Sequence, residues 1–253
     1  MPIDDLGTEV PISGPAARVV SLVPSLTEAI AATRPEALVG ATDWCTHPAE
    51  LDVTRVRGTK NPDRAAIEAL SPDLVIVNRE ENRKLDVERL RAAGVPVWVT
   101  VIETVEQSLE SMGRLFTEGL GWGRPDWLNH ATDLWAEPVA EPRGTLAVPI
   151  WRDPWMVVGP DTFTTDLLRR LGWRNVFDAS SAVDPDRYPH VDLAAIDIAD
   201  VDLVLLPDEP YVFSETDGPE AFTTAQTELV SGRLLTWYGP SLIESREVLS
   251  QIR

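Results

Sequence analysis

The sequence contains few of the residues on which several large classes of protein depend. Its 253 residues include one cysteine, Cys45, and three histidines, His47, His130 and His190. A single cysteine excludes an internal disulfide framework and a cluster of thiolate ligands. Zinc and manganese sites built from protein ligands need several His, Cys or carboxylate groups together. His47 and His190 therefore remain only as isolated metal-site candidates, and His130 is expected on the surface.

Positive charge is also scarce. The chain has 22 basic and 41 acidic residues, which gives a formal net charge of −19. Proteins that bind nucleic acid contact phosphates through clustered Lys and Arg. The composition therefore excludes a nucleic-acid partner and makes anionic membranes poor partners.

Several sequence motifs are missing as well. The expected first strand is followed by Pro24-Ser-Leu where dinucleotide and P-loop sites require glycines, and there is no G-x-S-x-G elbow. The first fourteen residues, MPIDDLGTEVPISG, are acidic and lack the apolar core of a signal peptide. The apolar runs, such as residues 201–207, are too short to span a bilayer. As written, the sequence predicts a cytoplasmic protein, or a periplasmic or extracellular one if a leader was removed.

Short apolar runs alternate with helical patterns. We expect strands at residues 18–23, 38–41, 73–77 and 95–101, with a helix that opens at residues 25–28 and further helices at 64–70 and 85–93 between them. Ser25 and Glu28 have the spacing of a capping box, which predicts Ser25 as the N-cap of the first helix. Strands alternating with helices predict parallel sheets flanked by helices, an α/β fold.

A change of pattern in the middle of the chain predicts two lobes. Residues 105–118 and 125–136 have helical spacing, and the strand–helix alternation resumes after Gly144. We therefore expect an N-terminal α/β lobe at residues 1–120, a bridging helix and linker at 121–142, and a C-terminal α/β lobe at 143–253.

Tryptophan is abundant, with nine residues. Trp44, Trp151, Trp155 and Trp237 fall in or beside loops that follow expected strands, where open α/β sheets bind ligands. Flat aromatic faces beside a few polar groups suit a large, planar, partly apolar ligand. Four other tryptophans are expected in packing positions: Trp98, Trp127, Trp135 and Trp173.

Four segments in order carry a family resemblance: RVVSLVPSLTEAI (residues 18–30), ALSPDLVIVNREEN (69–82), GPDTFTTDLLRRLGWRNVF (159–177) and ADVDLVLLPDEP (199–210). Together they resemble the cluster A (class III) solute-binding proteins. These helical-backbone metal receptors include proteins that bind cobalamin and ferric siderophores, and the loop at residues 42–48 is most similar to the cobalamin-binding type. The resemblance implies two α/β lobes bridged by a helix, with a metal chelate held in a cleft between them and no intrinsic cofactor.

The resemblance also implies which residues line the ligand. Trp44, Trp151 and Trp155 would stack on it or wall it, while Arg79, Arg152 and Arg187 would meet its polar or anionic side groups. The set expected from the first lobe is Pro24, Ser25, Trp44, His47, Lys60, Asn61, Arg79 and Glu80, the last two belonging to a segment, residues 79–82, that would line this lobe. The set expected from the second lobe is Trp151, Arg152, Trp155, Arg187, Tyr188, Glu209 and Tyr211.

Two positions depart from the family pattern. Transport-linked members present one glutamate on each lobe to arginines of an ABC permease, and alignment places Ala65 and Ala194 at those positions. Asp63, Glu68, Asp192 and Asp197 are nearby substitutes. The middle helix, at about 12 residues and roughly 18 Å, is short for a bridging helix. These departures favour a binding protein that does not dock a permease.

The leading hypothesis is therefore a non-enzymatic binding protein for a corrinoid such as cobalamin, a heme or a ferric siderophore, serving storage, trafficking or sensing. Three alternatives stay open. The chain could be the substrate-binding subunit of an ABC importer whose leader was removed, or a receptor for free zinc or manganese. It could also be a hydrolase that uses Asp153, Asp208 or Glu209.

Overall fold

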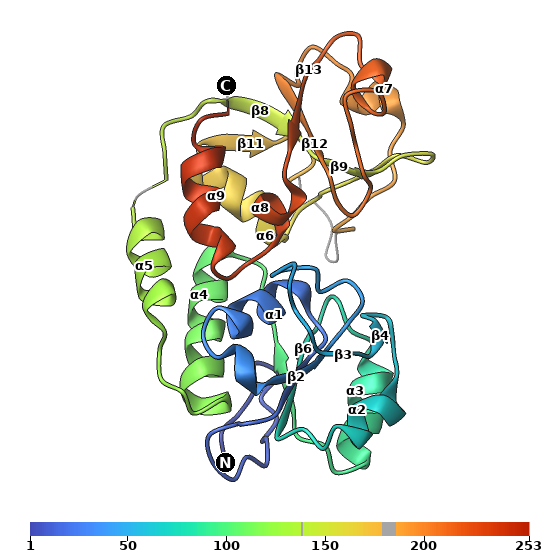
Figure 1. The fold of residues 1–253 in the computed structure, drawn as a ribbon. Helices are drawn as coiled ribbons and strands as arrows, with labels where there is room; N and C mark the ends of the chain where they lie inside the picture. The colour runs from blue at the N-terminus through green and yellow to red at the C-terminus, as the bar shows by residue number, and fades with distance from the viewer. Residues whose placement is uncertain (138, 179–185, 253) are drawn as a thin grey trace. The chain divides into compact units, whose positions relative to one another are not determined.

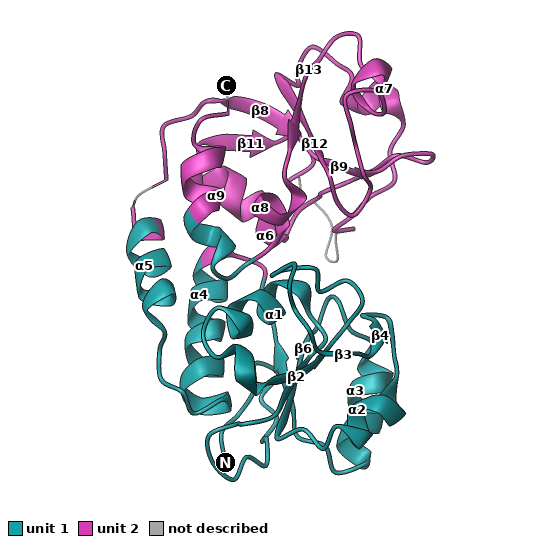
Figure 2. Ribbon diagram, in the orientation of Figure 1, with its two compact units in different colours: residues 1–102, 106–134, 238–243 teal, residues 103–105, 135–237, 244–253 magenta. Residues whose placement is uncertain are grey.

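The computed structural model describes residues 1–137, 139–178 and 186–252. Its chain divides into two compact units (Figure 2). Unit 1 comprises residues 1–102, 106–134 and 238–243, and unit 2 comprises residues 103–105, 135–237 and 244–253. Each unit has its own sheet and core.

Unit 1 is built on a five-stranded parallel sheet with the strand order β3-β2-β1-β6-β7. All five residues of the strand β6, LVIVN, are buried, as is typical of a parallel strand covered on both faces. The strands are β1 (Val19–Ser21), β2 (Leu38–Ala41), β3 (Thr54–Arg55), β6 (Leu74–Asn78) and β7 (Val97–Thr100), with a separate antiparallel pair of β4 (Arg57–Gly58) and β5 (Asn61–Pro62).

Helices cover both faces of this sheet (Figure 1). The helices of this unit are α1 (Pro24–Ala31), α2 (Arg64–Ala69), α3 (Lys84–Ala92), α4 (Val105–Arg114) with its π-helical continuation (Leu115–Gly119), and α5 (Asp126–Trp135), besides a 3₁₀ turn at Pro35–Ala37. Val20, Val75 and Val97 share a core with Ile67 of α2 and Leu90 of α3. Successive strand residues point to opposite faces, so Trp98 lies on the other side, beside the end of α4.

Trp98 is the largest of the fully buried side chains. The Arg114 guanidinium lies 5.8 Å from its ring centroid. A Cβ built on Gly119 would lie 3.0 Å from Trp98 Cε3. The π-helical segment therefore needs its glycine to pass this close to the indole ring.

The N-terminal segment is fixed to unit 1 by two aspartates. Asp4 is buried, accepts hydrogen bonds from the backbone amides of Leu6 and Thr8, and pairs with Arg91 at 2.6 Å. Asp5 accepts from the amide of Val101 at 3.0 Å and from Arg114 Nη1 at 2.8 Å. The segment is thereby joined to the end of β7 and to Arg114 at the end of α4.

Unit 2 has a four-stranded parallel sheet with the order β11-β8-β12-β13. A core containing Val204, Leu206, Trp155, Phe213 and Ile196 lies against it. Its strands are β8 (Gly144–Ala147), β11 (Trp173–Asn175), β12 (Leu203–Pro207) and β13 (Gln226–Val230), with the antiparallel hairpin of β9 (Pro149–Trp151) and β10 (Met156–Val157). Its helices are α6 (Phe163–Arg170), α7 (Leu193–Ile196), α8 (Gly232–Thr236) and α9 (Ser241–Leu249), whose first three residues belong to unit 1, and a 3₁₀ turn at Pro219–Ala221.

The predicted fold class is confirmed, because each unit is a parallel sheet flanked by helices. One local expectation is wrong. Helix α1 begins at Pro24, its N-cap residue is Val23, and no side chain caps it. Proline suits the first helical position because its fixed φ matches the helix and its missing N–H is not needed there. Ser25 is therefore inside the helix and buried.

Within the described part of the chain, every helix falls short of the length and apolar character that a bilayer crossing requires.

Trp98→Ala should lower the free energy of unfolding of the unit by about 3–5 kcal/mol, because it removes a fully buried aromatic and leaves a cavity. Urea unfolding followed by circular dichroism measures the change. Leu85→Ala, at an exposed position on α3, is the matched control and should change it by at most about 0.5 kcal/mol. Equal losses for the two variants would contradict this description of the core.

Candidate functional site

The loops that follow parallel strands gather at one edge of their sheet, here called the carboxyl edge, and open α/β sheets bind ligands at such edges. In unit 1 the residues expected from the sequence lie on or beside loops of this kind. Pro24 and Ser25 follow β1, Trp44 and His47 follow β2, Lys60 and Asn61 lie at the β4–β5 turn, and Arg79 and Glu80 follow β6.

Trp44 lies on a loop whose backbone carbonyls accept hydrogen bonds from Arg55. Its side chain is 67% exposed. Arg55 Nη1 donates to the carbonyl oxygens of Thr42 at 2.8 Å and Cys45 at 2.9 Å, one on each side of the tryptophan. The Cys45 side chain is buried against the hydroxyls of Thr27 and Thr42, and burial raises the pKa of its thiol. Cys45 therefore anchors the loop, and its indole neighbour is free to face a ligand.

Asn82 connects three of the unit 1 loops, a bracing role that sequence analysis did not predict. It is buried, and its side-chain amide donates to the carbonyls of Leu22 at 3.2 Å and Thr59 at 3.0 Å. Its Oδ1 accepts from the Asn78 amide at 2.9 Å. These bonds join the loops after β1, after β6 and at the β4–β5 turn. The sequence signal was the pair Asn78 and Asn82 after a buried strand.

The polar residues expected after β6 and at the β4–β5 turn form hydrogen bonds that connect these same loops. Lys60 Nζ donates to the Glu80 carbonyl at 2.5 Å, and the Glu80 amide donates to Asn78 Oδ1 at 2.8 Å. The Arg79 amide donates to the Thr100 carbonyl at 3.0 Å. The backbone of these loops is therefore fixed by hydrogen bonds within unit 1.

His47 lies on the same loop as Trp44. It is exposed and shares a contact of 3.3 Å between its Nδ1 and Thr46 Oγ1. A Cβ built on Gly58 would lie 3.3 Å from Trp44 Nε1, so the indole passes close to the β4–β5 turn. The carboxyl edge of unit 1 is thus a braced set of loops on which Trp44 is the prominent apolar surface.

In unit 2 the β9–β10 hairpin and the loop after β12 bring aromatic residues together. Trp151 is 46% exposed, and its ring meets that of Tyr211 edge-on at 5.5 Å between centroids. Trp155 is only 8% exposed and packs between Phe213 and Phe222 at 6.1 and 5.5 Å. The expectation that Trp155 walls the ligand is not supported by this placement. It belongs to the core beneath Trp151 and Tyr211.

Arg152 follows Trp151 and is surrounded by carboxylates. Its Nη1 donates to Glu220 Oε1 at 2.7 Å and also to Asp217, while Asp153 lies 3.5 Å from its Nε. Tyr211 Oη donates to the second oxygen of Asp217 at 2.7 Å. The hydrogen bond from Arg152 lowers the pKa of Glu220, and the one to Asp217 raises the pKa of Tyr211. Asp217 and Glu220 lie more than sixty residues from Arg152 in sequence, and no local pattern identifies them.

The other expected residues of unit 2 lie on neighbouring loops. Arg187 Nη1 donates to Glu103 Oε1 at 2.7 Å, and the Tyr188 amide donates to Asp186 at 3.1 Å. Burial raises the pKa of the Glu209 carboxyl, which follows β12. Its Oε1 is buried without a hydrogen-bond partner among the residues that the structure describes.

The histidines stand apart from any donor set. Among residues 1–137, 139–178 and 186–252, no group of three or more His, Cys, Asp or Glu side chains is arranged to hold a metal ion. His190 is exposed and forms an isolated bridge with Met156, and His130 is exposed on α5, as expected.

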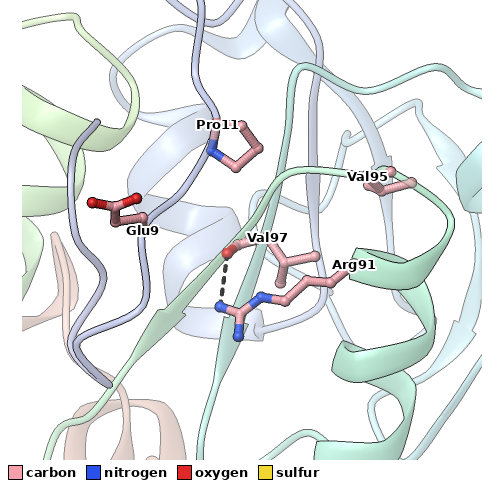
Figure 3. A pocket seen from close by; sticks show the side chains of 6 residues that line it. Glu9, Pro11, Arg91, Val95 and Val97 are labelled. Carbon is pink, nitrogen blue, oxygen red and sulfur yellow. Dashed lines mark hydrogen bonds between the residues drawn. The ribbon is translucent and has the colours of Figure 1, made fainter.

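A small pocket of unit 1 lies elsewhere (Figure 3). It is lined by Glu9, Pro11, Arg91, Gly94, Val95 and Val97. These residues belong to the N-terminal segment, the end of α3 and the start of β7. The pocket is thus at the end of the sheet where β7 begins, away from the loops that carry Trp44, and Arg91 is already bound to Asp4 and to the Val97 carbonyl.

The two positions aligned with docking glutamates, Ala65 on α2 and Ala194 on α7, are both exposed. Of the four nearby acids, Asp63 caps α2 by accepting from the Ala66 amide. Asp197 accepts from the amides of Thr223, Thr224 and Ala225, which lowers its pKa to about 2. Both are structural. Glu68 and Asp192 are exposed and are the remaining candidates.

Two α/β units, each with a parallel sheet and aromatic residues at its carboxyl edge, agree with the architecture that the resemblance to the cluster A solute-binding proteins implies. Comparison with known proteins confirms this resemblance. No family model matches the chain.

Three of the proteins that this chain resembles are named for vitamin B12 or heme. The chain is 26% identical over 192 residues to the vitamin B12-binding protein of Vibrio vulnificus strain CMCP6, covering 73% of this chain and 68% of the relative. Its fold matches the crystal structure of the periplasmic vitamin B12-binding protein of Vibrio cholerae with a TM-score of 0.75 and 17% identity, over 94% of this chain and 96% of that one. It also matches a periplasmic heme-binding protein of Pseudomonas aeruginosa with a TM-score of 0.71 and 21% identity, over 93% and 91%.

Asn82→Ala should lower the free energy of unfolding by about 1–3 kcal/mol, because it leaves the buried Asn78 amide without its acceptor. Hydrogen exchange at the Asn78 amide should accelerate in parallel. Asn129→Ala, at an exposed position on α5, is the control and should change stability by at most about 0.5 kcal/mol. Unchanged protection of the Asn78 amide in Asn82→Ala would refute the bracing role.

Proposed function

We propose that this protein binds a metal chelate, of the size and flatness of a corrinoid or a heme, and releases it chemically unchanged. The candidate ligands are a cobalamin or related corrinoid, a heme and a ferric siderophore. The metal arrives inside its chelate, so that the protein need supply no metal ligands of its own.

The observation that carries this proposal is the presentation of exposed aromatic rings on braced loops. Trp44 stands on a loop fixed by Arg55, and Trp151 meets Tyr211 above a buried aromatic core. When a flat, partly apolar ligand covers an exposed indole, the removal of apolar surface from water favours binding. A loop that is already rigid loses little conformational entropy in the process. The fold and the relatives named for vitamin B12 and heme support the same class of ligand.

Of the three carboxylates considered for hydrolysis, Asp208 accepts a structural hydrogen bond and Asp153 lies beside Arg152. Asp208 accepts from the Gly232 amide at 2.7 Å at the start of α8. Asp153 is exposed beside Arg152. These placements support binding without catalysis, and a chelate recovered unaltered after prolonged incubation with the protein would agree with it.

The direct experiment is titration with cyanocobalamin, hemin, a ferric hydroxamate siderophore and a ferric catecholate siderophore. Tryptophan quenching and the visible spectrum of the chelate report binding independently. We expect at least one chelate to bind with a Kd below about 100 μM. Failure of all four to bind would overturn the proposed function.

Trp44→Ala and Trp151→Ala should each weaken binding of the same chelate about tenfold, equivalent to about 1.4 kcal/mol, because each removes an exposed aromatic surface from contact. Calorimetric titration measures the change. Val248→Ala, which removes an exposed apolar side chain from α9, is the control and should leave the Kd unaltered. If all three variants bind like the wild type, the ligand lies elsewhere.

The residues at the two docking positions bear on whether an ABC permease receives the bound chelate. Alanines at positions 65 and 194, with Asp63 and Asp197 held in structural hydrogen bonds, support a protein that does not dock an ABC permease through paired glutamates. Storage, trafficking or sensing then fits better than delivery to an importer. Fractionation of native cells, with the chelate followed by its absorbance, tests where the protein acts.

Ala65→Glu with Ala194→Glu should create the missing pair at two exposed positions. We expect the double variant, and not the wild type, to stimulate the ATPase of a reconstituted importer that carries docking arginines. Glu68→Ala with Asp192→Ala is the control for the remaining acids. Stimulation by the wild type that is lost in this control would show that Glu68 and Asp192 substitute for the glutamates, and the proposal would fail.

A further inference from the structure

The charge around Arg152 is a feature of unit 2 that bears on ligand selection. The Arg152 cluster consists of Arg152, Asp217, Glu220 and Tyr211. One guanidinium contacts Asp217, contacts Glu220 at 2.7 Å and lies 3.5 Å from Asp153. One positive charge therefore faces three negative charges. A binding site that neutralises an anion needs an excess of positive charge, and this cluster has the opposite sign.

The acids of the cluster are also fixed in place. Asp217 accepts from Tyr211 Oη at 2.7 Å through one oxygen and from Arg152 through the other. Glu220 accepts from Arg152 and, through its second oxygen, from the Gly218 amide at 2.5 Å. The guanidinium itself lies 5.4 Å above the Trp155 ring. An anionic ligand could use Arg152 only by displacing carboxylates that have two partners each.

A second cation of this unit is also neutralised by an acid. Arg187 is paired with Glu103 at 2.7 Å. The polar groups beside Trp151 and Tyr211 are therefore mainly the carboxylate oxygens of Asp153, Asp217 and Glu220, which are hydrogen-bond acceptors and pair with N–H donors of a ligand.

We infer that the chelate bound by this protein has an uncharged or cationic rim of N–H donors, carboxamides and not carboxylates, where it meets the Arg152 cluster. This inference rests on the proposed function and narrows it. Carboxylate-rimmed tetrapyrroles and anionic siderophores are discriminated against by like-charge repulsion. Carboxamides meet acceptors and the faces of Trp151 and Tyr211.

The test compares two chelates with the same corrin ring and metal. Dicyanocobinamide carries carboxamide side chains, and dicyanocobyrinic acid carries free carboxylates at the corresponding positions. We expect the wild-type protein to bind the amide at least about tenfold more tightly than the acid, since like charges at close range oppose binding. Raising the salt concentration from about 0.05 to 0.5 M should strengthen binding of the acid, because salt screens repulsion.

A matched pair of variants assigns the selectivity to the cluster. Asp217→Asn with Glu220→Gln removes two negative charges beside Arg152 and should strengthen binding of the acid by about tenfold or more. It should weaken binding of the amide by a smaller factor, because the N–H donors of the amide lose charged acceptors. Glu247→Gln with Asp200→Asn makes the same change in net charge at two exposed positions outside the cluster. This control should alter neither affinity by more than about twofold, since distant surface charges are screened.

The outcomes distinguish a failure of this inference from a failure of the proposed function. Preference for the amide, lost in the cluster variant and kept in the control, supports the inference. Equal or tighter binding of the acid by the wild type overturns the inference and leaves the proposed function standing. If hemin or a ferric catecholate binds and dicyanocobinamide does not, the inference also fails and the proposed function still stands. If the cluster variant does not fold, the salt dependence decides: weaker binding of the acid at the higher salt concentration refutes the inference. Failure of every chelate to bind overturns both.

Discussion

Burial of a parallel sheet on both faces is the constraint on which the arrangement of this protein depends. A strand such as β6, buried throughout, cannot present side chains to a ligand along its length. Polar and aromatic groups that contact a ligand must then stand on the loops beyond the strand ends. Both units follow this rule, with Trp44 beyond β2 and Tyr211 beyond β12. The loops in turn need internal hydrogen bonds, because strands no longer hold them.

Much of the fold could be predicted because its signals are local. Short β-branched runs indicated β1, β2, β6 and β7, and helical spacing indicated α3 and α5 within a few residues. The strands β11 and β13 escaped prediction, since WRN and QTELV have little apolar character and become strands by pairing with β8 and β12. The N-cap of α1 was misplaced because proline at the first helical position overrode the capping pattern at Ser25.

The candidate site was predictable in its residue types and less so in its electrostatics. Exposed Trp44 and Trp151 are where loop aromatics were expected. Trp155, four residues further along in the turn before β10, is instead buried against Phe213 and Phe222, and the sequence contains no sign of that difference. Arg152 was expected to meet an anionic group of the ligand. Its actual partners, Asp217 and Glu220, are brought to it by the long connection after β12, and sequence separation of that kind hides an ion pair.

The bracing of the Trp44 loop by Arg55 has a consequence for kinetics. A loop that orders only around its ligand adds an entropic barrier to association and slows it. Here the carbonyls on both sides of Trp44 are bound to a guanidinium that belongs to a strand of the sheet. Ordering of the loop is therefore completed when unit 1 folds, and an arriving ligand encounters an indole already in position. Differences in affinity among ligands for this surface should then reside mainly in how long each remains bound.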